Sequence, residues 1–137
     1  MVSEERASDV IVDFVFDEGV LYVTVANLGE RPALKVSCRF EPGFNGLGGS
    51  VEISRLALFR NIEYLAPHKE IRTLVDSSAA YFARKEPTKL KVTVTYREDG
   101  GQRRQTTIAH DLGIYRDLAY VVPGSREEAV TDGVQPR

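Results

Sequence analysis

A few residues of this chain belong to types that perform chemistry, and their spacing decides whether they could form a site. The glycine-rich run from Gly43 to Ser50, GFNGLGGS, comes within one residue of a phosphate-binding loop. Gly49, however, stands where that loop needs the lysine that contacts phosphate, and no β-α-β pattern surrounds the run. It therefore predicts a flexible loop rather than a nucleotide site.

The cysteine and the two histidines are the other candidates. Cys38 is the only cysteine. It shares one predicted strand face with Leu34, Val36 and Phe40, opposite Lys35, Ser37 and Arg39, which predicts a buried thiol that is inert as a nucleophile. His68 and His110 lie far apart in the sequence, and neither has a second ligand at metal-binding spacing. We therefore expect no catalytic residues, no metal and no cofactor, and predict that the protein is not an enzyme.

Alternation of apolar and polar residues, the period of a half-buried strand, runs through most of the chain. It predicts strands over residues 9–16, 20–27, 33–40, 62–65, 69–76, 88–96 and 102–112. Ser77 and Ser78 offer N-cap oxygens to a short helix over residues 79–85, which Pro87 ends. Residues 41–50 predict a long loop, and residues 51–61 fit either a short helix or an irregular strand.

Length and composition set the wider limits. The 137 residues suffice for one domain with a hydrophobic core, which we place at residues 1–122. Residues 123–137 are polar and interrupted by proline and glycine, which predicts a disordered tail. Eighteen basic and twenty acidic residues give a net charge of -2, so overall charge does not favour nucleic acid. No apolar run reaches the roughly 20 residues of a membrane helix. The lone cysteine, the absence of a glycosylation sequon and a start without a signal-peptide pattern favour an intracellular or bacterial setting.

Three stretches resemble the CARDB-type immunoglobulin-like sandwiches of bacteria and archaea, which are accessory or adhesion-related domains. They are Asn27-Leu28-Gly29 followed by Pro32-Ala33, then Tyr64-Leu65-Ala66-Pro67 before the strand at 69–76, and the strand from Leu90 to Tyr96 with its hairpin. The resemblance covers about residues 9–112. It implies an all-β, immunoglobulin-like antiparallel sandwich of about seven strands, with one short crossover helix.

Combining the strand faces predicts one charged surface. In an immunoglobulin-like topology the strand at 33–40 shares a sheet with the last two strands, while the first two pair with the strand at 69–76. The outward positions of the first group carry no acid: Lys35, Ser37, Arg39, Lys89, Lys91, Arg97, Arg103 and Gln105. The outward positions of the second group are mostly acidic: Asp9, Asp13, Glu70, Arg72 and Asp76. The chain is thus predicted to be basic on one sheet and acidic on the other.

These faces suggest a function. We expect a non-catalytic protein-interaction or scaffold module that docks through its basic face, with the binding residues Lys35, Arg39, Lys89, Lys91, Arg97 and Arg103. A protein partner or self-association is favoured over a small molecule, and nucleic acid is the weaker option. Two alternatives stay open: the charges only solvate the surface, or the domain is a spacer in a membrane-tethered or multidomain protein with no ligand of its own.

Overall fold

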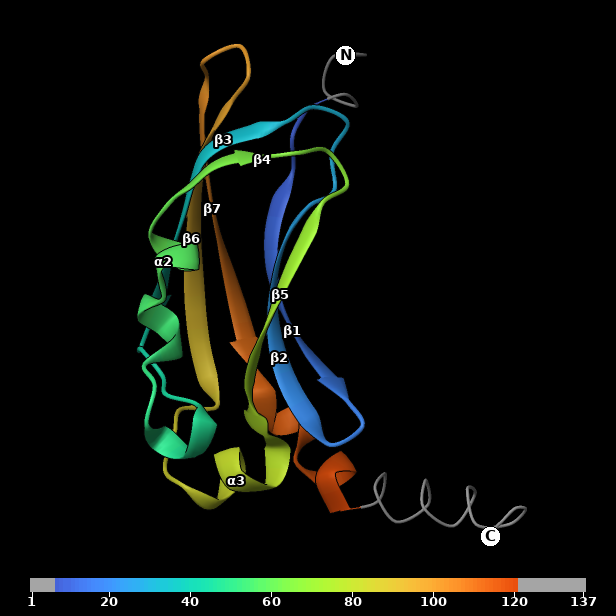
Figure 1. Cartoon of the computed structure of the whole chain (residues 1–137), viewed down its shortest axis with the longest axis vertical. Coiled ribbons are helices and arrows are strands. Elements are labelled where there is room, and N and C mark those ends of the chain that lie inside the picture. The colour runs from blue at the N-terminus through green and yellow to red at the C-terminus, as the bar shows by residue number, and fades with distance from the viewer. Residues whose placement is uncertain (1–6, 121–137) are drawn as a thin grey trace, which may run out of the picture.

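Two antiparallel sheets packed face to face form the protein in a computed structural model, which describes residues 7–120 (Figure 1). The three-stranded sheet has the order β1-β2-β5 and comprises β1 (Val10–Asp17), β2 (Val20–Asn27) and β5 (Glu70–Ser77). The four-stranded sheet has the order β4-β3-β6-β7 and comprises β4 (Ile62–Leu65), β3 (Ala33–Glu41), β6 (Lys89–Glu98) and β7 (Arg103–Asp111). The predicted all-β, immunoglobulin-like sandwich is therefore confirmed. The tail predicted at 123–137 lies outside the described residues.

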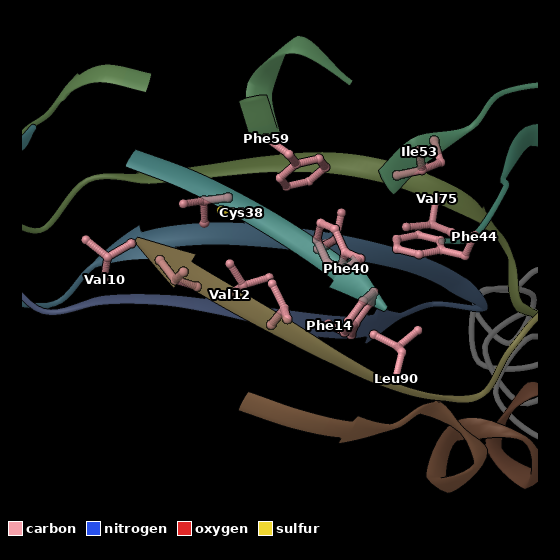
Figure 2. Packing of buried hydrophobic residues seen from close by; sticks show 14 of the residues in the cluster. Val10, Val12, Phe14, Cys38, Phe40, Phe44, Ile53, Phe59, Val75 and Leu90 are labelled. Carbon is pink, nitrogen blue, oxygen red and sulfur yellow. The ribbon is translucent and has the colours of Figure 1, made fainter. Parts of the chain in front are cut away.

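Alternation works as expected in β6, the strand at the centre of its sheet. Leu90, Val92, Val94 and Tyr96 are buried, while the residues between them face out. These side chains meet those of β1 and β2 across the sandwich, where Val12 and Phe14 are also buried (Figure 2). The alternation of a single strand thus places one layer of the core, because successive side chains point to opposite faces of a sheet.

The predicted crossover helix is α3 (Ser78–Ala83), which leads from β5 to β6 at one end of the sandwich (Figure 1). It begins as the sequence indicates: the Ser77 hydroxyl accepts a hydrogen bond from the Ala80 N–H at 3.1 Å. Tyr81 is fully buried and donates its hydroxyl proton to the Pro87 carbonyl at 2.6 Å. The helix therefore closes that end of the core.

The segment at 51–61, which the sequence left between helix and strand, is helical. It contains the 3-10 helix η2 (Ile53–Arg55) and the short helix α2 (Ala57–Arg60), and a further 3-10 turn, η1 (Leu47–Gly49), precedes them. Ile53 and Phe59 are buried, and the Phe59 ring lies 4.9 Å from that of Phe40 in an edge-on contact (Figure 2). The segment thus covers the side of the core next to β3, which no strand covers.

A β-bulge in β3 places Leu34 on the opposite face of the strand from the one predicted. The pairing with β6 shifts between Leu34 and Ser37, and Lys35 has a φ of 53°, in the left-handed region. Because two residues of β3 oppose one of β6 there, the alternation changes phase. Ala33 and Val36 are buried, and Leu34 faces outward with its cross-strand neighbours Tyr64 and Arg97. The prediction that Leu34 shares the inner face with Val36 is therefore wrong.

The corner between the two sheets is held by Asn27, which is fully buried. Its side-chain oxygen accepts hydrogen bonds from the N–H groups of Asp9 and Gly29, both at 3.0 Å. Its side-chain nitrogen donates to the carbonyl oxygens of Arg31 and Leu65, at 2.8 and 3.2 Å. All four hydrogen-bonding positions of the amide are used, and the bonds join the first strand, the corner and β4.

Side chains also cover the free edge of β1. The Leu28 N–H bonds to the Asp9 carbonyl, so by alternation the backbone groups of Val12 and Phe14 point away from β2. The Val12 carbonyl lies 3.0 Å from His110 Nε2, and the Phe14 carbonyl accepts a hydrogen bond from the Tyr115 hydroxyl at 3.0 Å. This edge is therefore closed to another strand.

Replacing Asn27 tests the importance of the corner. Asn27→Ala leaves buried backbone groups without partners, and we expect it to lower the free energy of unfolding by about 3 kcal/mol. The control is Asn61→Ala, because Asn61 is exposed and its side chain donates to the exposed Glu63 carboxylate. Chemical denaturation of both variants measures the difference. Equal losses at the two positions would contradict the role given to Asn27.

Candidate functional site

The residues that could perform chemistry are engaged in structural contacts. Cys38 is buried as predicted, and burial raises the pKa of its thiol to about 12, so the thiolate is scarce at neutral pH. His110 caps the β1 edge, and His68 lies on the surface 3.2 Å from Glu30. Within residues 7–120 no group of three or more metal-ligating side chains is present.

The glycine-rich loop binds a carboxylate of the protein itself. The Gly48 N–H donates to Asp76 Oδ2 at 2.9 Å, and Arg84 donates to the same oxygen at 2.8 Å. Burial by itself would raise the pKa of Asp76, but these hydrogen bonds and the Arg84 charge outweigh it and hold the pKa below its usual value. Asp76 therefore ties the loop to β5 and α3.

This contact corrects the predicted acidic face. Asp76 is buried instead of facing outward, because the β2–β5 pairing shifts between Leu21 and Tyr22 and turns the end of β5. Glu70 lies 3.7 Å from Arg72. Of the five residues predicted for this face, Asp9 and Asp13 are left as exposed acids without an ion pair in the described part of the chain. The outer face of the three-stranded sheet is thus only weakly acidic.

All six residues predicted to bind lie on β3, β6 and β7 of the four-stranded sheet, but two of them are already paired. Lys35 Nζ lies 2.8 Å from the Glu63 carboxylate and Arg39 Nε lies 3.6 Å from that of Glu41. Glu41 and Asp111 are exposed in cross-strand register with Lys91 and Lys89, so the prediction of a face without acids is wrong. Among the described residues, four of the six form no ion pair: Lys89, Lys91, Arg97 and Arg103.

The four unpaired cations form two clusters. Arg97 and Arg103 are cross-strand neighbours beside the β6–β7 hairpin, and Lys89 and Lys91 lie at the other end of β6. Lys91 and Arg97 are six residues apart, or roughly 20 Å at ~3.3 Å per residue. Between them the side chains of β6 and β7 on the outer face of the sheet are neutral: Thr93, Thr95, Gln105 and Thr107. The structure therefore separates what the sequence combined into a single basic surface.

Two apolar side chains and a hollow adjoin the cluster of Arg97 and Arg103 near the hairpin. Register places Tyr64, Leu34, Arg97 and Arg103 side by side across all four strands, in the order β4-β3-β6-β7. Beside this row is a hollow of about 320 Å³, whose lining has three cations and no acid: Lys35, Ser37, Thr95, Tyr96, Arg97 and Arg103. We call these two features together the hairpin-end site.

Sequence reasoning assigned neither Leu34 nor Tyr64 to a site. The stretch Leu34-Lys35-Val36 looks like uninterrupted alternation, and no glycine marks Lys35 as a bulge residue. Tyr64 is 60% exposed in a four-residue strand. Tyr64 lies beside Leu34 because β4 pairs with β3, although the two residues are 30 positions apart in the sequence. No local pattern encodes such a pairing.

The strain at Lys35 can be measured with two variants. A left-handed φ costs a residue with a Cβ about 1 kcal/mol or more, so Lys35→Gly should be more stable than Lys35→Ala by about 1 kcal/mol. Both variants lose the ion pair with Glu63, so its loss cancels. At Lys91, in a regular part of β6, the order should reverse. Thermal or urea unfolding compares the pairs, and a more stable Lys35→Ala would contradict the strained bulge.

The Asp76 contacts predict a pH-dependent stability. Because the folded-state pKa of Asp76 lies below its ordinary value of 3.8, the carboxylate stabilises the fold above that value, and this contribution is lost as pH falls through the folded-state pKa. Asp76→Asn should therefore cost about 2 kcal/mol at pH 7. The difference from the unsubstituted protein should shrink below about pH 4. Asp17→Asn, at an exposed position, serves as the control, and a pH-independent difference for Asp76→Asn would refute the prediction.

Comparison with known proteins identifies the family alone. The model of a family described as a domain of unknown function (DUF8453) matches residues 1–116. No curated protein and no solved structure matches the chain. Within residues 7–120 no helix is both long and apolar enough to cross a membrane.

Proposed function

The chain belongs to the DUF8453 family, and we propose that it is a non-catalytic protein-interaction module that docks an acidic partner through its hairpin-end site. One observation carries the proposal: Arg97 and Arg103 are direct cross-strand neighbours, and neither has an acidic partner among the described residues. The acids nearby in sequence are engaged elsewhere, since Asp99 pairs with Arg31 and Glu98 with Arg104.

This arrangement is unfavourable in the isolated protein. Like charges directly opposite each other on neighbouring strands destabilise a sheet, typically by a few tenths of a kcal/mol to about 1 kcal/mol. Lys35, whose charge is paired with Glu63, lines the same hollow at a backbone position that itself costs energy. A carboxylate or phosphate in the hollow would reverse the sign of the repulsion. Arginine suits this role, because its planar group can donate two parallel hydrogen bonds to such an anion.

The neighbouring apolar side chains supply contact area. Tyr64 is 60% exposed, and Leu34 is half-buried at its side. Aromatic residues and arginines are enriched at the centres of protein interfaces, where they bury large areas and still make polar contacts. A partner segment with an acidic residue next to an apolar one would match the row from Tyr64 to Arg103. The hollow, at about 320 Å³, is small for a ligand pocket and its lining is mostly polar, which suits a protein surface better than a small molecule.

A spacer role is the second candidate, and the path of the chain favours it. The described chain begins beside the β6–β7 hairpin, where Ser8 bonds to Glu98, and ends past α3 at the opposite end of the long axis (Figure 1). A domain with its two ends at opposite poles can extend a chain of domains. Such a spacer would fit the CARDB-type resemblance, and it would bind nothing at the hairpin-end site.

Charge reversal separates the two roles. A fluorescein-labelled oligoglutamate peptide serves as the probe, and fluorescence anisotropy gives its Kd at about 50 and 300 mM salt. We expect saturable binding that weakens with salt and that Arg97→Glu with Arg103→Glu reduces by about tenfold or more. The matched control is Lys89→Glu with Lys91→Glu, which reverses two charges on the same sheet and should change the Kd less than about threefold.

Three outcomes would overturn the proposal. Equal effects of the two double variants would mean nonspecific attraction to the whole face. Absence of binding by the unsubstituted protein would favour the spacer. The third outcome is that a single-stranded oligonucleotide binds more tightly than oligoglutamate and that the Arg97→Glu, Arg103→Glu variant loses this binding. It would identify nucleic acid, not a protein, as the partner.

A further inference from the structure

Half of β3 has no neighbouring strand on one side. β3 spans nine residues, but β4 spans four, and their pairing ends at Val36 and Ile62. Before Ile62 the chain forms α2 instead of continuing as a strand. Residues 37–41 of β3 are therefore paired with β6 on one side only.

Hydrogen bonds at both ends of β6 show which way the backbone groups point. The Glu98 N–H bonds to the Gln102 carbonyl, and the Leu112 N–H bonds to the Thr88 carbonyl. In an antiparallel pair, hydrogen-bonded positions alternate along each strand. The even-numbered residues of β6 therefore bond to β7, and its odd-numbered residues bond to β3.

This alternation leaves two residues of β3 with unpaired backbone groups. Cys38 and Phe40 are in register with Val94 and Val92, which are even-numbered, so their N–H and C=O groups point away from β6. In the described part of the chain no hydrogen bond to either residue is present on that side. Both residues are buried, with 6% and 7% exposure. Backbone groups of residues with so little exposure are nearly always paired, so two alternate residues without partners on one side indicate a missing partner.

Cys38 and Phe40 line a groove. It has a volume of about 770 Å³ and runs between residues 37–41 of β3 on one side and η2 and α2 on the other. Phe59 extends from α2 towards Phe40 (Figure 2), and it lines the groove on the core side. The repeat of two residues between Cys38 and Phe40, roughly 7 Å, is the spacing at which an extended chain presents its own N–H and C=O groups.

Charges along the groove indicate the chemistry of its occupant. Arg39 lies 3.6 Å from Glu41 and Arg55 lies 3.4 Å from Glu52, which leaves each pair neutral. Arg60, which is exposed, lines the groove without an ion pair within residues 7–120. The groove therefore carries one uncompensated positive charge, which an acidic side chain would complement.

From the unpaired backbone, the groove and its charge, we infer that β3 accepts an extended, acid-bearing peptide of a partner protein as an additional strand. The backbone of the peptide bonds to Cys38 and Phe40, and its acidic side chain meets Arg60. Strand addition of this kind takes affinity from the main chain and specificity from the alternate side chains. The covered edge of β1 shows the contrast, because His110 and Tyr115 occupy there the acceptors that a strand would need. This site is separate from the hairpin-end site and does not depend on it.

The test uses the full-length chain and a labelled short peptide of alternating valine and threonine with a central glutamate. Two further forms of the peptide are N-methylated at every second amide. One form carries the methyl groups on the odd-numbered amides and the other on the even-numbered amides. Only one set can face β3, so one form should bind like the parent peptide and the other should lose about tenfold or more. Arg60→Glu should weaken binding of the glutamate peptide by about tenfold and favour a matched peptide with a central lysine.

A control variant separates this inference from the proposed function. Arg97→Glu with Arg103→Glu should leave the Kd of the valine-threonine peptide within about twofold, because its groups lie outside the groove. Equal binding of both N-methylated forms would exclude strand addition. Absence of saturable binding below about 1 mM would overturn the inference. If the chain instead dimerises, binds no peptide, and loses the dimer on Arg60→Glu substitution, the inference is also overturned. The edge would then be the contact to a second copy of the chain.

Discussion

The buried amide of Asn27 is the interaction on which the other features of this sandwich depend. Its oxygen and nitrogen connect the beginning of β1, the corner after β2 and the end of β4, and its own N–H and C=O join the turn before β5, at Lys69 and His68. A buried amide must pair all its groups or destabilise the fold. Asn27 can do so only when both sheets are in their native positions. Gly29 contributes to the same corner, because a Cβ there would lie 2.0 Å from the Ala7 carbonyl oxygen.

Once the corner is set, the bulge at Lys35 decides what the outer face of the four-stranded sheet presents. Without the extra residue, Leu34 would stay on the inner face. With it, Leu34 and Tyr64 stand beside Arg97 and Arg103, so an apolar pair adjoins a basic pair in one row. The strained backbone of Lys35 thus costs conformational energy, and it gives the outer face both charge and apolar contact area.

The edges of the sandwich are treated differently, and this difference follows from the length of β4. On the β1 side, polar side chains from β7 and from η3 (Leu112–Tyr115) reach the free carbonyl oxygens. On the β3 side, η2 and α2 supply Ile53 and Phe59 to the core but no backbone partner to Cys38 and Phe40. Apolar burial and backbone pairing are separate requirements, and a helix beside a strand edge meets only the first.

Local pattern in the chain determined the class of fold, the hairpins, the N-cap of α3 and the burial of Cys38, because period-two alternation and turn residues act over a few neighbouring positions. Tertiary structure alone decided the outward turn of Leu34, the burial of Asp76 against Arg84 and the placement of Glu41 and Asp111 beside the two lysines of β6. Each of these follows from strand register or from a bulge. Register is set by pairing between distant segments, and a shift of one residue moves a side chain to the opposite face. The basic residues of the outer face and their spacing along β6 were therefore predictable from the sequence, whereas the acids that lie beside the lysines were not.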